Sequence, residues 1–384
     1  MSKSKPRVLI LVTEDWYFSG NALGVARALK AAGCEVAVAC HITGSGEAII
    51  REGIRLFPLK MSRNSINPFH LVACIVRIVR VYRTYRPDII HHVALKPVLL
   101  GGLAARIVGI GKIINAVAGL GYIFTSSSLR ARLLRPMVRL GLRLLLNRTD
   151  ARTCVQNREN GVVLTASGIV AADRVRLIPG AGVDLARFQS SPEPSDPPRA
   201  TLVSRMISEK GIKETVEAAR LLAAQDTDVR ITLAGKSDGE NPSAIPQRQL
   251  DQWAEEGVVE FLGHVEDIPA LWAKSHIAVL PSYYGEGVPR ALVEAAACGR
   301  PMIAADGPGL RDIVRHGETG LLVPPRDSVA LAGAIADLSG DPERRRRMGA
   351  SARRLAEQRF GSDSIIAATL EVYHELLGDA WPVP

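Results

Sequence analysis

The chain has 384 residues and a formal charge of +9, and 47% of its residues are hydrophobic. This composition excludes a disordered or collagen-like chain. The length exceeds what one hydrophobic core usually supports, so we expect two domains of roughly 150–200 residues each. No apolar run reaches about 18 residues, which argues against a membrane-spanning helix.

The first apolar segment, Val8–Val12, is followed almost at once by Glu14 and Asp15. Five apolar residues are too few for the core of a signal peptide, so this segment predicts a buried strand. The five cysteines are dispersed and form no C-x-x-C pair. An odd, dispersed set without an export signal indicates free buried thiols in a reducing compartment, and we expect a cytoplasmic protein.

Strand-like and helix-like segments alternate along the first half of the chain. Strands are expected at 8–12, 35–40, 55–59, 89–92 and 112–117, with helices at 21–32 and 101–108. A Pro- and Ser-rich stretch at 189–200 is interpreted as a linker or loop on an exposed boundary. The alternation then resumes with strands at 201–204, 230–234, 258–262, 277–280 and 301–304.

Strands that alternate with crossover helices predict parallel sheets. We therefore expect an α/β protein with two doubly wound, Rossmann-like domains, 1–185 and 186–364, facing each other across a cleft. A last helix at about 365–384 is expected to pack back on the first domain. In such sheets ligands bind outside the carboxyl ends of the strands. The G-x-G-x-x-G and G-x-x-x-x-G-K-[ST] fingerprints of dinucleotide and P-loop sites are absent from the sequence.

The positive charge is concentrated in the first half. Residues 1–170 contain 24 Lys and Arg against 8 Asp and Glu, whereas the remainder contains 24 against 31. The segments 71–86 and 129–148 place arginines at helical spacing beside apolar residues. In the second segment these are Arg132, Arg135, Arg139 and Arg143. Such a face is either solvated or docks on anionic headgroups. Nucleic acid ranks lower, because the sequence has no aromatic stacking cluster or zinc motif.

The clearest chemistry follows the expected strand at 277–280. Glu286 and Gly287 lie in the loop after this strand, Pro289 suits the first turn of a helix, and Glu294 lies about two turns further on. A glycine lets the backbone approach a ligand, and a helix N-terminus offers N–H groups to an anion. Both glutamates can accept hydrogen bonds from sugar hydroxyls. The alternative is a capping carboxylate and a solvated helix residue.

This region resembles the E-x7-E motif of retaining glycosyltransferases of family 4, which have the GT-B fold. The surrounding sequence agrees, with FLGH at 261–264, ACGRP at 297–301, ETGLLV at 318–323 and SRMISEKG at 204–211. The resemblance covers nearly the whole chain and is strongest over 201–325. It implies a metal-independent hexosyltransferase that uses a nucleotide-sugar donor as substrate and needs no cofactor.

The resemblance also implies roles for single residues. Arg205 and Lys210 should grip the donor diphosphate, whose charge grows as the glycosidic bond breaks. Glu286 should bind the donor sugar ring and Glu294 the ribose. Further expected contacts of the nucleotide-sugar are Gly287, Val288, Pro289, Gly235 and, near the base, His264. The alternatives are ordinary surface charge for Arg205 and Lys210, and a capped surface imidazole for His264.

Retaining transfer usually requires two carboxylates about 5 Å apart. In the first half only Glu14 and Asp15 follow a strand suitably, and capping of a loop is the favoured reading for them. The family is described by front-face displacement, in which the departing phosphate helps to deprotonate the acceptor. Residues expected to face the acceptor or a phosphate are Ser19, Gly20, Asn21, Lys96, Gly119 and His92. His91 and His92 alternate on a strand, so at most one of them faces the cleft.

The segments 62–69, 119–122 and 235–243 are similar to enzymes that extend a sugar on a polyprenyl diphosphate. They are nearest to bacterial N-acetylgalactosaminyltransferases that act on undecaprenyl-diphosphate-linked bacillosamine. The resemblance implies a UDP-sugar donor, a polyprenyl-diphosphate-linked acceptor and a peripheral position on the inner face of the cell membrane. A lipid-linked acceptor agrees with the two Arg-rich helices. The sequence does not predict an oligomeric state.

Two other functions are compatible with such a fold. One is another GT-B enzyme, such as a non-hydrolysing sugar-nucleotide epimerase, which needs no lipid acceptor. The other is a non-catalytic subunit that binds a sugar nucleotide. The E-x7-E context argues against the first, and the presence of Glu286, Glu294, Arg205 and Lys210 argues against the second.

Overall fold

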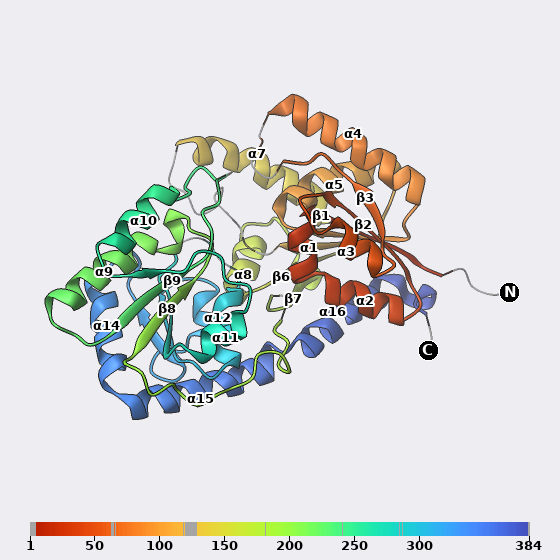
Figure 1. Cartoon of the computed structure of the whole chain (residues 1–384). Helices are drawn as coiled ribbons and strands as arrows, with labels where there is room; N and C mark the ends of the chain where they lie inside the picture. The colour runs from red at the N-terminus through yellow and green to blue at the C-terminus, as the bar shows by residue number, and fades with distance from the viewer. Residues whose placement is uncertain are drawn as a thin grey trace. The chain divides into compact units, whose positions relative to one another are not determined.

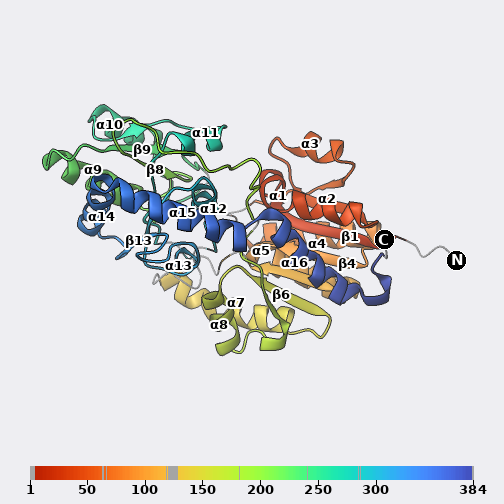
Figure 2. The same ribbon diagram turned by 90° about the horizontal axis from the view of Figure 1, so that it is seen from below.

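The computed structural model describes residues 5–62, 65, 67–117, 119, 129–180, 182–239, 241–283, 285 and 287–382. The chain divides into two compact units, Met1–Ala181 with Asp363–Pro384 (unit 1) and Gly182–Ser362 (unit 2). Each unit is a parallel sheet covered by helices (Figures 1 and 2). The predicted fold class, two α/β domains with parallel sheets, is confirmed.

Unit 1 contains a seven-stranded parallel sheet in the order β3-β2-β1-β4-β5-β6-β7. Its strands are β1 (Arg7–Glu14), β2 (Glu35–His41), β3 (Arg55–Pro58), β4 (Ile89–Val93), β5 (Ile113–Val117), β6 (Ala151–Val155) and β7 (Val175–Leu177). The strand order reverses between β1 and β4. Loops that leave β1 and β4 in opposite directions open a crevice at the carboxyl edge, the usual ligand position in such sheets.

Helices cover both faces of this sheet. They are α1 (Asp15–Asn21), α2 (Leu23–Ala31), α3 (Gly46–Arg51), α4 (Pro68–Tyr85), α5 (Leu95–Val108), α7 (Leu129–Leu146), α8 (Arg158–Ala166) and α16 (Ser362–Leu377), with the 3-10 turns η1 (Ala172–Arg174) and η3 (Gly378–Ala380). Alternate residues of β1 point to opposite faces of the sheet, so they pack under different layers of helices. Val8 and Ile10 share a core with α2 and α16, whereas Leu9 and Leu11 pack with α4 and α5. All four are fully buried, at about 1.5–3 kcal/mol each.

Unit 2 contains a six-stranded parallel sheet in the order β10-β9-β8-β11-β12-β13. Its strands are β8 (Arg199–Val203), β9 (Arg230–Ala234), β10 (Glu260–Phe261), β11 (Ile277–Leu280), β12 (Met302–Ala305) and β13 (Gly320–Val323). Its helices are η2 (Ser208–Lys210), α9 (Ile212–Ala224), α10 (Gln247–Glu255), α11 (Ile268–Ala273), α12 (Arg290–Ala297), α13 (Leu310–Ile313), α14 (Ser328–Gly340) and α15 (Pro342–Arg359). One core lies under α9, α10 and α14, and the other under α11, α12, α13 and α15.

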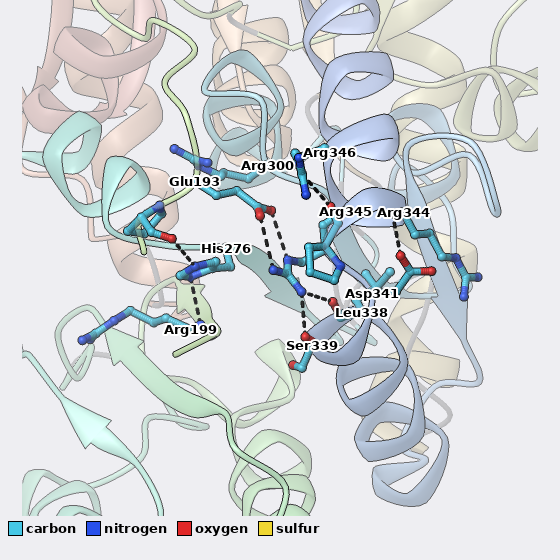
Figure 3. Close-up of polar contacts among 12 residues, drawn as sticks. Glu193, Arg199, His276, Arg300, Leu338, Ser339, Asp341, Arg344, Arg345 and Arg346 are labelled. Atoms are coloured by element: carbon cyan, nitrogen blue, oxygen red, sulfur yellow. Dashed lines mark hydrogen bonds and ion pairs between the residues drawn. The ribbon is translucent and has the colours of Figure 1, made fainter. Parts of the chain in front are cut away.

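The Pro-rich stretch, predicted as a linker or loop on an exposed boundary, forms no helix or strand before Arg199 and is fastened to unit 2 (Figure 3). The Arg345 side chain, 4% exposed, forms a two-pronged ion pair with Glu193 at 3.0 and 3.2 Å. It also donates to the carbonyls of Leu338 and Ser339. The guanidinium of Arg300 bonds Ser191 Oγ at 2.6 Å. These partners lie more than a hundred residues away, so the local composition could not predict them.

His276 holds the same stretch further along. The Arg199 N–H donates to its Nδ1 at 3.1 Å, so Nε2 carries the proton and donates to the Pro194 carbonyl at 3.1 Å. Burial lowers the pKa of His276, which keeps the ring neutral in this arrangement. The ring therefore joins the Pro-rich stretch to the start of β8.

All five cysteines are free and buried, as the sequence predicted. Burial raises the pKa of Cys40 and Cys154 to about 12, so these thiols are protonated at neutral pH. In the part of the chain that the structure describes, no helix is long and apolar enough to cross a bilayer.

Candidate active site

The loops at the carboxyl edge of the unit 2 sheet are joined by backbone hydrogen bonds. The Met206 N–H, after β8, donates to the Lys236 carbonyl after β9 at 2.8 Å. The Gly235 N–H donates to Gly263, after β10, at 2.7 Å, and Tyr283, after β11, donates to the Glu209 carbonyl at 3.0 Å. Four successive strand ends therefore form one connected edge, which fixes the positions of the side chains that it carries.

Two glycines allow this close approach. A Cβ on Gly235, whose φ is +149°, would lie 1.7 Å from the Ser204 carbonyl oxygen. A Cβ on Gly211, whose φ is +76°, would lie 2.4 Å from the carbonyl oxygen of Pro281. Only glycine fits at both positions, because the contacted atoms are backbone and cannot rotate away. The missing side chain of Gly235 therefore lets the β8 and β9 loops come together, whereas its contact with the nucleotide-sugar remains a prediction.

Arg205 and Lys210 both lie in the loop after β8, five residues apart. The Arg205 guanidinium is 43% exposed and bonds the Asp238 carboxylate at 2.7 Å. Lys210 is the last residue of η2 and is half-buried. Asp238 was not predicted as a site residue, although it lies in a segment that the sequence analysis singled out. Its pairing with Arg205 restricts the guanidinium to the carboxyl edge of the sheet.

Helix α12 begins at this edge and buries a carboxylate. Pro289 is its N-cap, and no described side chain caps it. Glu294 lies inside α12, is 7% exposed, and bonds the Arg290 guanidinium at 2.7 Å. Burial raises the pKa of Glu294, while the guanidinium of Arg290 opposes that rise. Glu294 is thus not a solvated helix residue; it is a nearly buried acceptor held in place by a partner one turn away.

The other predicted residues of this edge lie just before α12 or after β10. Val288 is buried in the core beneath the helix, and Gly287, just before it, is half-buried. His264 is exposed in the loop after β10. Glu286, predicted to bind the donor sugar, lies outside the described residues. Its role therefore remains a prediction.

The sequence analysis did not predict one cation–π pair at this edge. Arg326, after β13, places its guanidinium carbon 4.3 Å from the centre of the Tyr283 ring. This is within the range of a cation–π contact. Arg326 has a φ of +63°, which is uncommon outside glycine. There is little indication of this pair in the sequence, because Arg326 stands alone between two prolines and an aspartate and belongs to no recognisable motif.

In unit 1, Asp15 caps a loop. Its carboxylate accepts hydrogen bonds from the backbone N–H groups of Thr43, Gly44 and Ser45 at 2.7–3.0 Å, and from the Thr43 hydroxyl at 2.5 Å. Burial alone would raise the pKa of Asp15, but these bonds lower it. With both oxygens engaged, Asp15 holds the loop after β2, which is the reading the sequence analysis favoured over a nucleophile.

The predicted residues after β1 lie on the short helix α1. The Ser19 hydroxyl donates to the Asp15 carbonyl at 3.0 Å, and the Asn21 amide donates to Tyr17 at 3.0 Å. Gly20 is exposed between them. Asn21 is half-buried and lines a cavity in unit 1, whereas Ser19 uses its hydrogen on its own helix.

The two histidines of β4 lie on opposite faces of the sheet. His92 is fully buried, with Nδ1 2.9 Å from Asn115 Oδ1 and Nε2 2.9 Å from the Tyr82 hydroxyl. Burial lowers its pKa to about 4. Both ring nitrogens are engaged inside the core, so this geometry does not fit the phosphate- or acceptor-facing role expected of His92. His91 takes the other face, as the period of two requires.

Lys96 and Gly119 complete the predicted set. Lys96 lies in the first turn of α5, and its ammonium bonds the carbonyls of Ser62 and Ser65 at 2.9 and 2.7 Å. Burial lowers the pKa of Lys96. It therefore anchors the loop before α4. Gly119 is half-buried just after β5, and its immediate neighbours lie outside the described residues.

The two units each match a family model. The model described as "Glycosyl transferase 4-like" matches residues 7–153, and that described as "Glycosyl transferases group 1" matches residues 184–355. Together with the two parallel sheets, these matches define a GT-B fold. The chain belongs to the group 1, GT-B glycosyltransferases.

Two curated relatives show the range of likeness. The chain is 26% identical over 338 residues to the N,N'-diacetylbacillosaminyl-diphospho-undecaprenol alpha-1,3-N-acetylgalactosaminyltransferase of Campylobacter jejuni, covering 85% of this chain and 87% of that protein. It is 32% identical over 210 residues to an exopolysaccharide phosphotransferase of Streptomyces coelicolor. That match covers 54% of this chain but only 21% of the relative.

Solved structures share the fold over nearly the full chain. A sucrose-phosphate synthase from Thermosynechococcus elongatus superposes with a TM-score of 0.79 at 23% identity, covering 98% of this chain and 100% of that one. HepE of Anabaena, in complex with UDP and glucose, superposes with a TM-score of 0.74 at 21% identity, covering 95% and 98%.

Proposed function

We propose that this protein transfers an N-acetylhexosamine, such as N-acetylgalactosamine, from a UDP-sugar to a polyprenyl-diphosphate-linked saccharide in bacterial glycan assembly. The observation that carries the proposal is the connected carboxyl edge of unit 2. It combines two cations on one loop, the start of helix α12 and a buried carboxylate. These are the groups that a diphosphate and a ribose need: positive charge and N–H donors for the first, and an acceptor for the second.

The donor diphosphate is assigned to Arg205 and Lys210. As the bond to the sugar breaks, negative charge accumulates on the departing phosphate, and nearby cations stabilise it more in the transition state than in the ground state. Lys210→Ala should therefore cost about 2–4 kcal/mol of transition-state stabilisation, roughly 30- to 1000-fold in rate. Turnover within about threefold of wild type would exclude this role. Lys213→Ala, on α9 three residues away, is the matched control.

The two glutamates of the E-x7-E pair are assigned different parts of the donor. Glu294, held by Arg290, accepts hydrogen bonds from the ribose hydroxyls, and Glu286 contacts the donor sugar ring. Glu294→Ala should weaken UDP binding, whereas Glu286→Gln should lower turnover and leave UDP binding in place. Calorimetry with UDP separates the two, and an equal loss of UDP affinity in both variants would contradict the assignment.

The acceptor class is supported by the likeness to the Campylobacter jejuni transferase over 85% of this chain, and by the surface of unit 1. Helix α5 packs against both α4 and α7. Together these helices expose large apolar side chains: Phe69, Val72, Val76, Leu103, Ile107, Leu133, Met137, Leu140 and Leu144. Arg80, Arg83, Arg139 and Arg143 are exposed on the same helices. Apolar side chains flanked by arginines suit the surface of an anionic bilayer.

We therefore propose that the protein binds peripherally to the inner face of the cell membrane. Co-sedimentation with anionic liposomes should occur at low salt and be reversed by high salt, because exposed charges are screened over about 8–10 Å at physiological ionic strength. Replacing Arg132, Arg135, Arg139 and Arg143 by Gln should release the protein. Identical pelleting of both forms at every salt concentration would end this assignment.

The central experiment is a donor screen with a short-chain polyprenyl-diphosphate N-acetylated sugar as acceptor, read out by mass spectrometry. Transfer from a UDP-N-acetylhexosamine, undiminished by EDTA, is the expected result, and the anomeric configuration of the product tests retention. Conversion of the UDP-sugar without an acceptor would instead identify an epimerase. Donor binding with no conversion at all would identify a non-catalytic subunit.

A further inference from the structure

The loops that follow β8 and β9 are attached to each other on both sides of Asp238. The Met206 N–H, in the loop after β8, donates to the Lys236 carbonyl in the loop after β9 at 2.8 Å. Further along the same two loops, the Ser208 N–H donates to the Ser243 carbonyl at 2.9 Å. Asp238 lies between Lys236 and Ser243 in the chain. Its backbone is therefore held between two points of attachment to the loop after β8.

The carboxylate of Asp238 is the less exposed member of an ion pair whose other member is open to solvent. The Asp238 side chain is 13% exposed and accepts a hydrogen bond from Nη1 of Arg205 at 2.7 Å. The Arg205 side chain is 43% exposed. A guanidinium has several further N–H donors, so one bond to a carboxylate leaves others for an anion. The pair thus restricts a cation without using all of its donors.

Such a carboxylate has two opposite effects on an anion that reaches the guanidinium. A free arginine side chain samples many rotamers, and a partner that orders it in advance lowers the entropy cost of each later contact. The negative charge of the same partner weakens the attraction between the guanidinium and the anion. In ground-state binding these two effects oppose each other. In a transition state where charge accumulates on one phosphate, the position of the cation decides how much of that charge it stabilises.

We propose that Asp238 is a positioning residue for the donor diphosphate, because it holds the Arg205 guanidinium where charge develops on the departing phosphate. The inference rests on the proposed function, in which Arg205 contacts this diphosphate. Asp238 needs no contact with the donor, since its effect passes through Arg205. It should therefore influence turnover more than the affinity for UDP, and only while Arg205 is present.

The first test separates turnover from binding, with the donor and acceptor that the wild-type protein uses. Asp238→Ala should lower kcat about tenfold and change the Kd of UDP, measured by calorimetry, by less than about threefold. Asp238→Asn keeps an oxygen acceptor for the guanidinium, so its kcat should lie within about threefold of wild type. A fall in UDP affinity as large as the fall in kcat, or an unchanged kcat in Asp238→Ala, overturns the proposal.

The matched control is Glu256→Ala, which removes a carboxylate from another exposed arginine of unit 2. Glu256, at the end of α10, lies 2.7 Å from the guanidinium of Arg220 on α9, whose side chain is 37% exposed. This pair has the same length as the pair between Arg205 and Asp238 but lies on helices. Glu256→Ala should therefore change neither kcat nor the Kd of UDP.

The second test shows whether Asp238 acts through Arg205. Added to Arg205→Ala, the Asp238→Ala change should alter kcat by less than about twofold, since no guanidinium is left to position. A purely structural role would lower kcat equally in both backgrounds, and that result overturns the proposal. If Arg205→Ala alone leaves kcat unchanged, the proposed donor site is wrong. An effect of Arg205→Ala without an effect of Asp238→Ala contradicts the positioning role alone.

A measurement without turnover tests the pair itself. In protein labelled with ¹⁵N at arginine, the bond to Asp238 should slow rotation of the Arg205 guanidinium and keep the resonances of its two Nη groups distinct. In Asp238→Ala they should merge, as in a freely rotating side chain. Arg205→Ala assigns the resonances, and urea unfolding shows whether each variant is folded. Resonances that are merged in the wild type, or distinct in Asp238→Ala, overturn the positioning role. A restricted guanidinium in a protein that transfers no sugar contradicts the proposed function alone.

Discussion

The ion pair between Glu193 and Arg345 allows a quantitative test of how unit 2 is held together. Removal of Glu193 leaves a guanidinium that is 4% exposed with only the carbonyls of Leu338 and Ser339 as acceptors. Removing one partner of a buried pair typically costs about 3–5 kcal/mol. Glu193 is 15% exposed and already partly hydrated, so we expect Glu193→Ala to destabilise unit 2 by about 2–4 kcal/mol.

If the ion pair stabilises unit 2 in this way, the effects of changing Glu193 and Arg345 on the free energy of unfolding should not be additive. Arg345→Met should also cost about 3 kcal/mol, because two carbonyls and one carboxylate lose their donor. The double variant should cost much less than the sum of the single changes, since it leaves no unpaired charge. A loss of about 3 kcal/mol corresponds to a fall of roughly 6–12 °C in Tm for a unit of this size.

The assay is thermal and urea unfolding followed by tryptophan fluorescence, in which Trp253 and Trp272 report on unit 2 and Trp16 and Trp381 report on unit 1. The control is Arg344→Met, on the same helix. Its partner Asp337 is 3.9 Å away and 65% exposed, and such surface pairs contribute about 0–1 kcal/mol. The reasoning fails if Glu193→Ala costs no more than the control, or if the two single costs add in the double variant.

Three further predictions concern other parts of the chain. Gly235→Ala should abolish UDP binding measured by calorimetry, because its Cβ would overlap the backbone of the neighbouring loop, whereas Gly239→Ala, with nothing within 4 Å of the added carbon, should bind normally. Glu294→Gln should keep most of the UDP affinity and remove its dependence on pH near the raised pKa of that carboxyl, as titration at several pH values will show. The pKa values of His91 and His92 are lowered to about 3 and 4, so the unfolded chain gains two protons below about pH 6.5 that the native chain does not. Stability should therefore be fully present above pH 6.5 and fall by about 2.7 kcal/mol per pH unit towards pH 4, measured by urea unfolding at each pH.

Much of the site was predictable because its residues are close together in the sequence. The loop after β8 supplies both Arg205 and Lys210, and the start of α12 is marked by a proline and by the E-x7-E spacing. What the pattern could not predict were the partners of these residues. Asp238 reaches Arg205 across 33 residues, and Gly235 matters because of a carbonyl on another loop.

The two histidines of β4 also show which features the sequence predicts and which depend on tertiary contacts. Alternation along a strand required His91 and His92 to lie on opposite faces, and the sequence alone determined that much. Which face opens on a cavity was decided by α16, whose Tyr373 lies 282 residues beyond His91. The Pro-rich stretch is a second example, since its partner Arg345 lies 152 residues from Glu193.

The sequence by itself thus determined the elements, the parallel sheets, the family and the positions of the loops that we propose bind the donor. Each of these follows from residue periodicity or from spacing within one segment. Only the tertiary structure decided which charges are buried and paired, which histidine lines a cavity, and which glycines have no room for a side chain. These depend on contacts between distant segments, and burial in such contacts, not residue type, sets the pKa and the availability of each group.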